Sequence, residues 1–206
     1  MKFREPLDDI LGQRVKIKIL RCLALNGMEL SGRKIAEETG ISPAGAHKAL
    51  KDLVESHIIL ERRAGRAFLF KLNQENYLAQ EMLMPLFERE DSLLKLALGS
   101  MIKKIHASII SLILYGSLAQ KRETPRSDID LLVIVSPKNK RKIEEAFDKI
   151  SSGFLTKYGR ALSPYIITIK EFQNKYRERL PFIVDVVKTG IVIRGKLISE
   201  LLSYDR

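Results

Sequence analysis

The chain has 206 residues, of which 45% are hydrophobic and 30% charged, and a formal net charge of +11 at pH 7. This length accommodates one large or two small domains, and the composition is typical of a soluble globular protein. A single cysteine, Cys22, excludes an internal disulfide framework, and the sequence holds no Cys/His cluster for zinc. No apolar stretch approaches the roughly 20 residues that span a bilayer, and no secretory signal is recognisable, so we expect a cytoplasmic protein with no membrane partner. The positive charge favours a polyanionic partner.

The first 73 residues are predicted to form helices followed by a hairpin. Ser31 and Ser42 are good N-caps, and Pro43 occupies the first helical position, where its missing N–H costs nothing. Apolar residues flank a charged tip over residues 61–66, which predicts a two-stranded hairpin. The predicted elements are helices over residues 12–25, 31–40 and 42–54 and a hairpin over residues 58–72. Helix, helix, helix, hairpin is the order of a winged helix-turn-helix.

A helical segment over residues 74–105 comes next, and Pro85 is expected to break it. The part before the second domain is predicted either to connect the domains within one chain or to serve as the helix of a homodimer. The predicted domains are a winged helix-turn-helix domain over 1–73, a helical connector over 74–91 and a second domain over 92–206.

From residue 106 onward, predicted strands alternate with predicted helices. The strands cover residues 109–115, 128–135, 162–169 and 191–193, and the helices cover residues 140–157, 171–178 and 181–189. This alternation indicates an α/β or α+β domain, and we expect a mixed β-sheet flanked by helices and an α+β chain as a whole.

The sharpest chemical feature is a Gly-Ser pair at the end of one strand and an Asp-x-Asp pattern in the next. Alternation along a strand places Asp128 and Asp130 on the same face, where two carboxylates repel each other unless a cation lies between them. Such oxygen ligands suit Mg²⁺, which completes its shell with substrate phosphates. Gly116 and Ser117 at the strand end allow a phosphate to approach the backbone closely. Together these residues outline a nucleotide site.

The segments 114–119 (LYGSLA) and 127–133 (SDIDLLV) resemble the signature of the DNA polymerase beta nucleotidyltransferase superfamily, closest to its minimal prokaryotic members. The resemblance covers about residues 92–195. It implies that Gly116 and Ser117 hold the triphosphate of ATP or another nucleoside triphosphate. It also implies that Asp128 and Asp130 are catalytic and bind the Mg²⁺ ions used in nucleotidyl transfer.

Two further groups of residues belong to this prediction. Lys121, Arg122 and Arg126, between the two motifs, are expected either to contact phosphates or to form a solvated basic loop. Active members of the family usually carry a third carboxylate on the next strand, but no acid lies in residues 163–169. Glu171, just beyond that strand, is the candidate substitute, or else an acid favoured at a helix N-terminus. The missing strand acid leaves catalysis open.

Residues 31–42 (SGRKIAEETGIS) resemble the helix-turn-helix of bacterial and archaeal winged-helix regulators. Small and hydrogen-bonding groups on the following helix suit base edges in the major groove of double-stranded DNA, and basic groups suit phosphates. The predicted DNA-binding residues are Ser42, Ala44, His47, Lys48 and Lys51 on that helix and Arg62, Arg63 and Arg66 at the hairpin tip. A protein–protein module, or a solvated charged turn, is the alternative.

Three hypotheses about function follow. The first is a DNA-binding protein whose second domain transfers a nucleotidyl group to an unknown acceptor. The second is a transcription regulator whose second domain is a catalytically degenerate nucleotide sensor or dimerisation module. The third, based on family analogy alone, is an antitoxin that modifies or binds a toxin protein.

Overall fold

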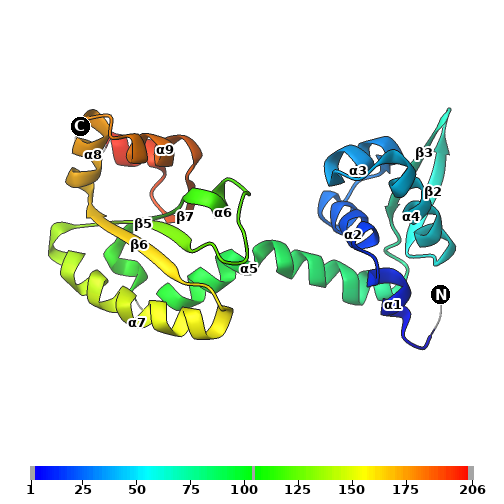
Figure 1. The fold of residues 1–206 in the computed structure, drawn as a ribbon, viewed down its shortest axis with the longest axis horizontal. Coiled ribbons are helices and arrows are strands. Elements are labelled where there is room, and N and C mark those ends of the chain that lie inside the picture. Colours follow the sequence, from blue (N-terminus) through cyan, green and yellow to red (C-terminus); the bar gives the residue numbers. More distant parts are fainter. Residues whose placement is uncertain (1–2, 104, 204–206) are drawn as a thin grey trace. The chain divides into compact units, whose positions relative to one another are not determined.

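The computed structural model describes residues 3–103 and 105–203. The chain divides into two compact units, Met1–Leu94 and Lys95–Arg206 (Figure 1). None of the helices among the described residues is long and apolar enough to cross a membrane.

The first unit has the predicted winged helix-turn-helix fold. Its elements are α1 (Pro6–Leu11), α2 (Arg14–Asn26), β1 (Leu30–Ser31), α3 (Gly32–Thr39), α4 (Pro43–Glu55), β2 (Ile59–Ala64) and β3 (Ala67–Leu72). The strands form an antiparallel sheet in the order β1-β3-β2. Both predicted N-caps are confirmed, because the Ser31 hydroxyl accepts from the Lys34 amide and the Ser42 hydroxyl accepts from the Gly45 amide, each at 3.2 Å.

The hairpin turn is tighter than predicted. Arg62 and Arg63 are not in the tip but inside β2, where they pair with Leu69 and Phe68 of β3. Only Gly65 and Arg66 form the turn. Most of β2 is exposed, so charged side chains are tolerated along residues 61–64, which the sequence placed in the tip and the structure places in the strand. The helix α1 and the short strand β1 were not predicted either.

The core of the first unit is apolar, and the charged side chain of Lys16 is buried at its edge. It is built from Ile19, Leu20, Leu23, Ile35, Leu50, Leu53, Ile58 and Phe70. Lys16 is 7% exposed, and its ammonium lies 2.9 Å from the carbonyl oxygen of Asp9 and 3.2 Å from Oδ2 of Asp52. The paired ammonium therefore ties α1, α2 and α4 together at the edge of this core.

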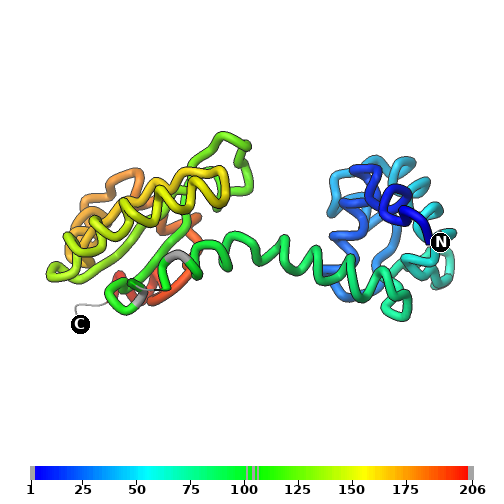
Figure 2. Tube along the Cα trace, turned by 90° about the horizontal axis from the view of Figure 1, so that it is seen from below, coloured from blue at the N-terminus to red at the C-terminus, as the bar shows by residue number. Residues whose placement is uncertain are grey.

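Pro85 does not break the helix that leaves this unit, so that prediction is wrong. A π-helical turn, η1 (Ala79–Leu83), leads directly into α5 (Met84–Ile102). Proline lacks the N–H that would bond back along the helix, and the wider turn before Pro85 accommodates this loss. Leu83 and Phe87 from this segment pack into the core of the first unit. Figure 2 shows the segment as a continuous helical trace.

The second unit is the predicted mixed sheet with helices. Its main elements are β4 (Ile109–Leu114), α6 (Gly116–Ala119), β5 (Ile129–Val135), α7 (Lys140–Tyr158), β6 (Leu162–Thr168), α8 (Ile169–Arg177), α9 (Pro181–Thr189), β7 (Ile191–Gly195) and α10 (Ile198–Leu202). The strand order is β6-β5-β4-β7, with β5 and β6 parallel and the other pairs antiparallel. The helices α6 and α10 were not predicted, and the sequence placed only a strand-end turn at Gly116 and Ser117.

Both faces of this sheet are covered, with α7 on one side and α8 and α9 on the other (Figure 1). On the second side, Leu132 and Ile134 of β5 pack in one cluster with Phe172 of α8 and Ile183 of α9. Because side chains alternate along a strand, Asp130 shares the face of Leu132. Asp130 therefore lies at the start of β5, on the side covered by α8 and α9.

Candidate functional site

The two predicted motifs of the second unit meet at one end of the sheet. Strands β4 and β5 are antiparallel, so the end of β4 lies beside the beginning of β5. The Tyr115 amide donates to the carbonyl oxygen of Asp130 at 3.1 Å. This pairing places Gly116 directly against Asp130.

Gly116 is required there for two reasons. Its φ of +72° lies in the left-handed region, which residues with a side chain rarely adopt. A Cβ at this position would overlap Oδ2 of Asp130 and come within 3.0 Å of its Cγ. The backbone after β4 and the first carboxylate of β5 are therefore in direct contact.

The two aspartates interact through their charges. Burial, and then the negative charge of Asp128, raise the pKa of Asp130 above its ordinary value. A cation between the two carboxylates would relieve this repulsion. Among residues 3–103 and 105–203, no group of three or more His, Cys, Asp or Glu side chains is placed to hold a metal ion. A pair of carboxylates nevertheless fits Mg²⁺, which takes one or two from the protein and completes its shell with water and phosphate oxygens.

The loop from α6 to β5 carries the remaining predicted residues. Ser117 is partly buried in α6, and its carbonyl oxygen accepts from the Arg122 amide at 2.8 Å. The guanidinium of Arg122 bonds the side chain of Gln120. Lys121, Arg122 and Arg126 are all exposed, and within the described chain none forms an ion pair. Their charges remain available to an anion.

Glu171 lies at the other end of the sheet. It belongs to the capping box of α8, in which the Thr168 amide donates to its Oε2 at 2.7 Å. Thr168 pairs with Val135, the last residue of β5, about 20 Å along the strand from the aspartates. The Thr168 amide, and then the Lys140 ammonium 2.9 Å away, hold the pKa of Glu171 below its ordinary value. The structure therefore does not bring Glu171 to Asp128 and Asp130.

Two residues that the sequence did not single out as candidates do lie at the aspartate end. Asp185 of α9 accepts from Gln120 Nε2 at 3.4 Å, next to the turn that holds Gly116. Arg160 precedes the start of β6, where the Ile129 amide donates to the carbonyl oxygen of Ala161 at 2.9 Å. Nε and Nη2 of Arg160 are buried without a hydrogen-bond partner in the described chain. The sequence around Asp185 and Arg160 does not predict that they lie near the aspartates, because their location depends on the pairing of distant strands.

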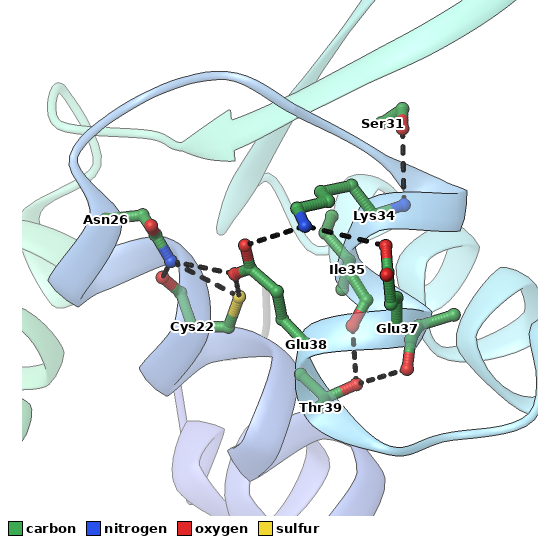
Figure 3. A network of polar contacts seen from close by, with 9 residues as sticks. Cys22, Asn26, Ser31, Lys34, Ile35, Glu37, Glu38 and Thr39 are labelled. Atoms are coloured by element: carbon green, nitrogen blue, oxygen red, sulfur yellow. Dashed lines mark hydrogen bonds and ion pairs between the residues drawn. The ribbon is translucent and has the colours of Figure 1, made fainter.

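In the first unit, a network of hydrogen bonds connects α3 with α2 (Figure 3). The carboxylate of Glu38 accepts from Asn26 Nδ2 at 3.1 Å and from the Cys22 thiol at 3.3 Å, and it lies 3.7 Å from the Lys34 ammonium. Burial, and then Glu38, raise the pKa of Cys22 to about 11. Cys22 therefore stays a neutral thiol and serves the helix-turn-helix as a donor.

The predicted recognition helix exposes the expected face. Ala44, His47, Lys48 and Lys51 of α4 are exposed, while Ala46, Leu50 and Leu53 on the other side are buried. Ser42, exposed at the start of α4, uses its hydroxyl as the N-cap.

The arginines of the hairpin differ in their surroundings. Arg62 is held by Glu29, with Nη2 and Oε2 2.5 Å apart. Arg63 is exposed and donates through Nε to the carbonyl oxygen of Gly65 at 3.2 Å. Arg66 is exposed in the turn itself. Arg63 and Arg66 therefore keep charges that no acid within the described residues neutralises.

The fold and the site define a DNA-binding type of domain followed by a nucleotidyltransferase type of domain. Residues 13–59 match the family model of the winged helix-turn-helix DNA-binding domain, and residues 95–193 match that of the nucleotidyltransferase domain. The chain is therefore a fusion of these two families, which confirms the resemblance seen in the sequence. No curated protein matches the chain.

Several solved structures are similar to parts of the chain. The antimony-specific transcriptional repressor AntR is 20% identical, with 44% of this chain and 76% of that chain covered and a TM-score of 0.36. A homodimeric winged helix-turn-helix domain from Mycobacterium bovis, a possible ArsR-family regulator, is 22% identical over 48% and 93% of the two chains, with a TM-score of 0.33. A toxin-antitoxin structure with AMP-PNP is 14% identical over 53% and 82%, with a TM-score of 0.38. At such scores these likenesses add nothing to the assignment of the two domains.

Proposed function

We propose that this protein binds double-stranded DNA through its first unit and a nucleoside triphosphate with Mg²⁺ through its second. The second unit then transfers a nucleotidyl group to an acceptor. The observation that supports the site most strongly is the contact of Gly116 with Asp130, beside the charge of Asp128. A turn with glycine allows a phosphate to approach the backbone closely, and the neighbouring carboxylate oxygens can bind the Mg²⁺ that accompanies the phosphate.

Each residue has a distinct part in this proposal. Asp128 and Asp130 would hold Mg²⁺, which when bound neutralises phosphate charge as a Lewis acid. Gly116 leaves room for the carboxylate of Asp130 against the backbone, and Ser117 would offer its hydroxyl to the phosphates. Lys121, Arg122 and Arg126 are exposed cations on the adjoining loop and attract the triphosphate. The DNA-binding surface consists of Ala44, His47, Lys48 and Lys51 of α4 together with Arg63 and Arg66 of the hairpin.

A second candidate function is a regulator that binds nucleotide without turning it over. It is favoured by the finding that, within the described residues, no third acid joins Asp128 and Asp130 in a group that could hold a metal ion, although Asp185 lies at the same end of the sheet. General-base catalysis needs a group within hydrogen-bond reach of the attacking hydroxyl. Both candidate functions use the same nucleotide site and the same DNA-binding unit. They differ in that only the enzyme releases pyrophosphate from the bound nucleotide.

Calorimetric titration of the full chain tests the site. ATP and the other nucleoside triphosphates are titrated with and without MgCl₂ into the wild type, Asp128→Asn and Asp130→Asn, with Asp148→Asn as control because Asp148 is an exposed acid on α7. We expect Mg²⁺-dependent binding that both site variants lose and the control keeps. Binding that survives in both site variants would refute the site. Pyrophosphate release in the presence of nucleotide then separates an enzyme from a sensor.

A further inference from the structure

Three aromatic rings from three elements meet in the second unit. The Phe182 ring of α9 packs edge-on against Tyr115, at the end of β4, with centroids 5.0 Å apart and planes at 75°. It also packs edge-on against Tyr165 of β6, with centroids 5.5 Å apart and planes at 81°. We call Tyr115, Phe182 and Tyr165 the aromatic cluster.

The aromatic cluster lies on the sheet face that carries the carboxylates. Tyr165 of β6 pairs with Leu132 of β5, which lies two residues after Asp130. The side chains of Tyr165 and Asp130 therefore lie on the same face of the sheet. Tyr115 directly precedes Gly116. Burial, then the charge of Asp130, and then Tyr165 raise the pKa of Tyr115 to about 12. The Tyr115 amide donates to the carbonyl oxygen of Asp130 at 3.1 Å, so the aromatic cluster adjoins the end of the sheet that carries this aspartate.

The aromatic cluster is only partly covered. Phe182 is 39% exposed and Tyr165 is 37% exposed, although their neighbour Ile183 is fully buried. Edge-to-face packing covers at most one face of each ring, so ring surface remains open for stacking. Asp185 follows Phe182 by one turn of the same helix α9, and its carboxylate accepts from Gln120 at the turn after Gly116.

We propose that the aromatic cluster is the subsite for the base of the nucleotide. This inference rests on the proposed function, because it takes the phosphates to lie at Gly116 and the aspartate pair. The base then stacks on Phe182 and Tyr165. Every base has a stacking face, so such a site accepts all four bases and favours the larger purines.

Titrations of two probes into the full chain test this subsite. MgATP carries phosphates and base, whereas inorganic triphosphate with Mg²⁺ carries phosphates alone. Base–aromatic stacking is worth about tenfold or more in affinity. We expect Phe182→Leu and Tyr165→Leu each to weaken MgATP binding about tenfold and to leave triphosphate binding unchanged. Phe182→Tyr, which keeps the ring, should retain the wild-type affinity for both probes.

Tyr176→Leu is the matched control. Tyr176 is also 37% exposed, lies on α8 of the same unit and makes no ring contact with the aromatic cluster in the described structure. We expect it to bind both probes like the wild type. Equal affinity of the wild type for MgATP and triphosphate, or equal losses for both probes in Phe182→Leu, would overturn the subsite but leave the proposed function standing. Failure of the wild type to bind either probe would overturn the proposed function itself.

Discussion

The α-carbon of Gly116 lies against the carboxylate of Asp130, so that a methyl group on it would overlap Oδ2. The two residues are 14 positions apart in the sequence, and the antiparallel pairing of β4 with β5 brings them together. The same pairing fixes the direction of the chain as it leaves β4, since Gly116 adopts a φ of +72°. One contact thus joins the candidate phosphate-binding turn to the candidate metal ligands.

Replacing Gly116 by Ala is expected to abolish nucleotide binding and to lower stability. A left-handed residue other than glycine costs about 1 kcal/mol, and the overlap with Asp130 adds to this. Gly159→Ala is the control, because Gly159 has a φ of +66° but a Cβ there meets nothing within 4 Å. Thermal unfolding should show the larger loss in Gly116→Ala, and calorimetry should show lost MgATP binding in that variant alone. Equal effects of the two substitutions would contradict the contact.

Without Mg²⁺, Asp130→Asn is expected to raise the unfolding temperature at pH 7 to 8. The raised pKa of Asp130 means that the folded state disfavours the ionised carboxylate, so stability falls as the pH rises through that pKa. The gain should shrink as the pH is lowered toward the ordinary aspartate range near about 4. With Mg²⁺ the order should reverse, because only the wild type gains stability from the metal. Scanning calorimetry over pH measures both effects, and a variant less stable than the wild type without Mg²⁺ would count against the repulsion.

Glu171→Gln is expected to lower stability while leaving nucleotide binding intact. A glutamine can still accept the Thr168 amide in a capping box, so the loss comes from the weaker, uncharged acceptor and amounts to about 1 kcal/mol, to which the exposed ion pair with Lys140 adds little. Because the pKa of Glu171 is lowered, its stabilising contribution is present above the ordinary glutamate pKa and is lost as the pH falls through the lowered value. Chemical unfolding at several pH values measures this dependence. Loss of MgATP affinity in Glu171→Gln would place it in the site after all.

In the hairpin, Arg66→Gln is expected to weaken DNA binding more than Arg62→Gln does. Each lost phosphate contact reduces the slope of log K against log salt by about 0.9. Arg62 is engaged by Glu29, whereas Arg66 is exposed in the turn. Fluorescence anisotropy with duplex DNA at several salt concentrations measures both slopes, and Glu29→Gln should release Arg62 and steepen the slope. An unchanged slope in Arg66→Gln would exclude the hairpin tip from the interface.

Local sequence patterns determined much of the fold. The N-caps Ser31 and Ser42 and the helical period around Leu50 and Leu53 predicted α3 and α4, because capping and amphipathicity are properties of a few neighbouring residues. The apolar runs over residues 109–115 and 128–135 likewise predicted β4 and β5. Where a local rule competed with packing, the prediction failed. Pro85 lies inside a continuous helical segment because Leu83 and Phe87 bury their side chains on either side of it.

In the candidate site, too, some residues could be predicted from the sequence and others only from the tertiary structure. The sequence by itself predicted Gly116, Ser117, Asp128 and Asp130 as site residues, because turn chemistry and strand alternation depend on adjacent residues. Only the tertiary structure decided that Glu171 caps a helix at the far end of the sheet, and that Phe182, Tyr165 and Asp185 gather near the aspartates. Strand order and register set these distances, and pairing between distant segments leaves no signature in the local sequence.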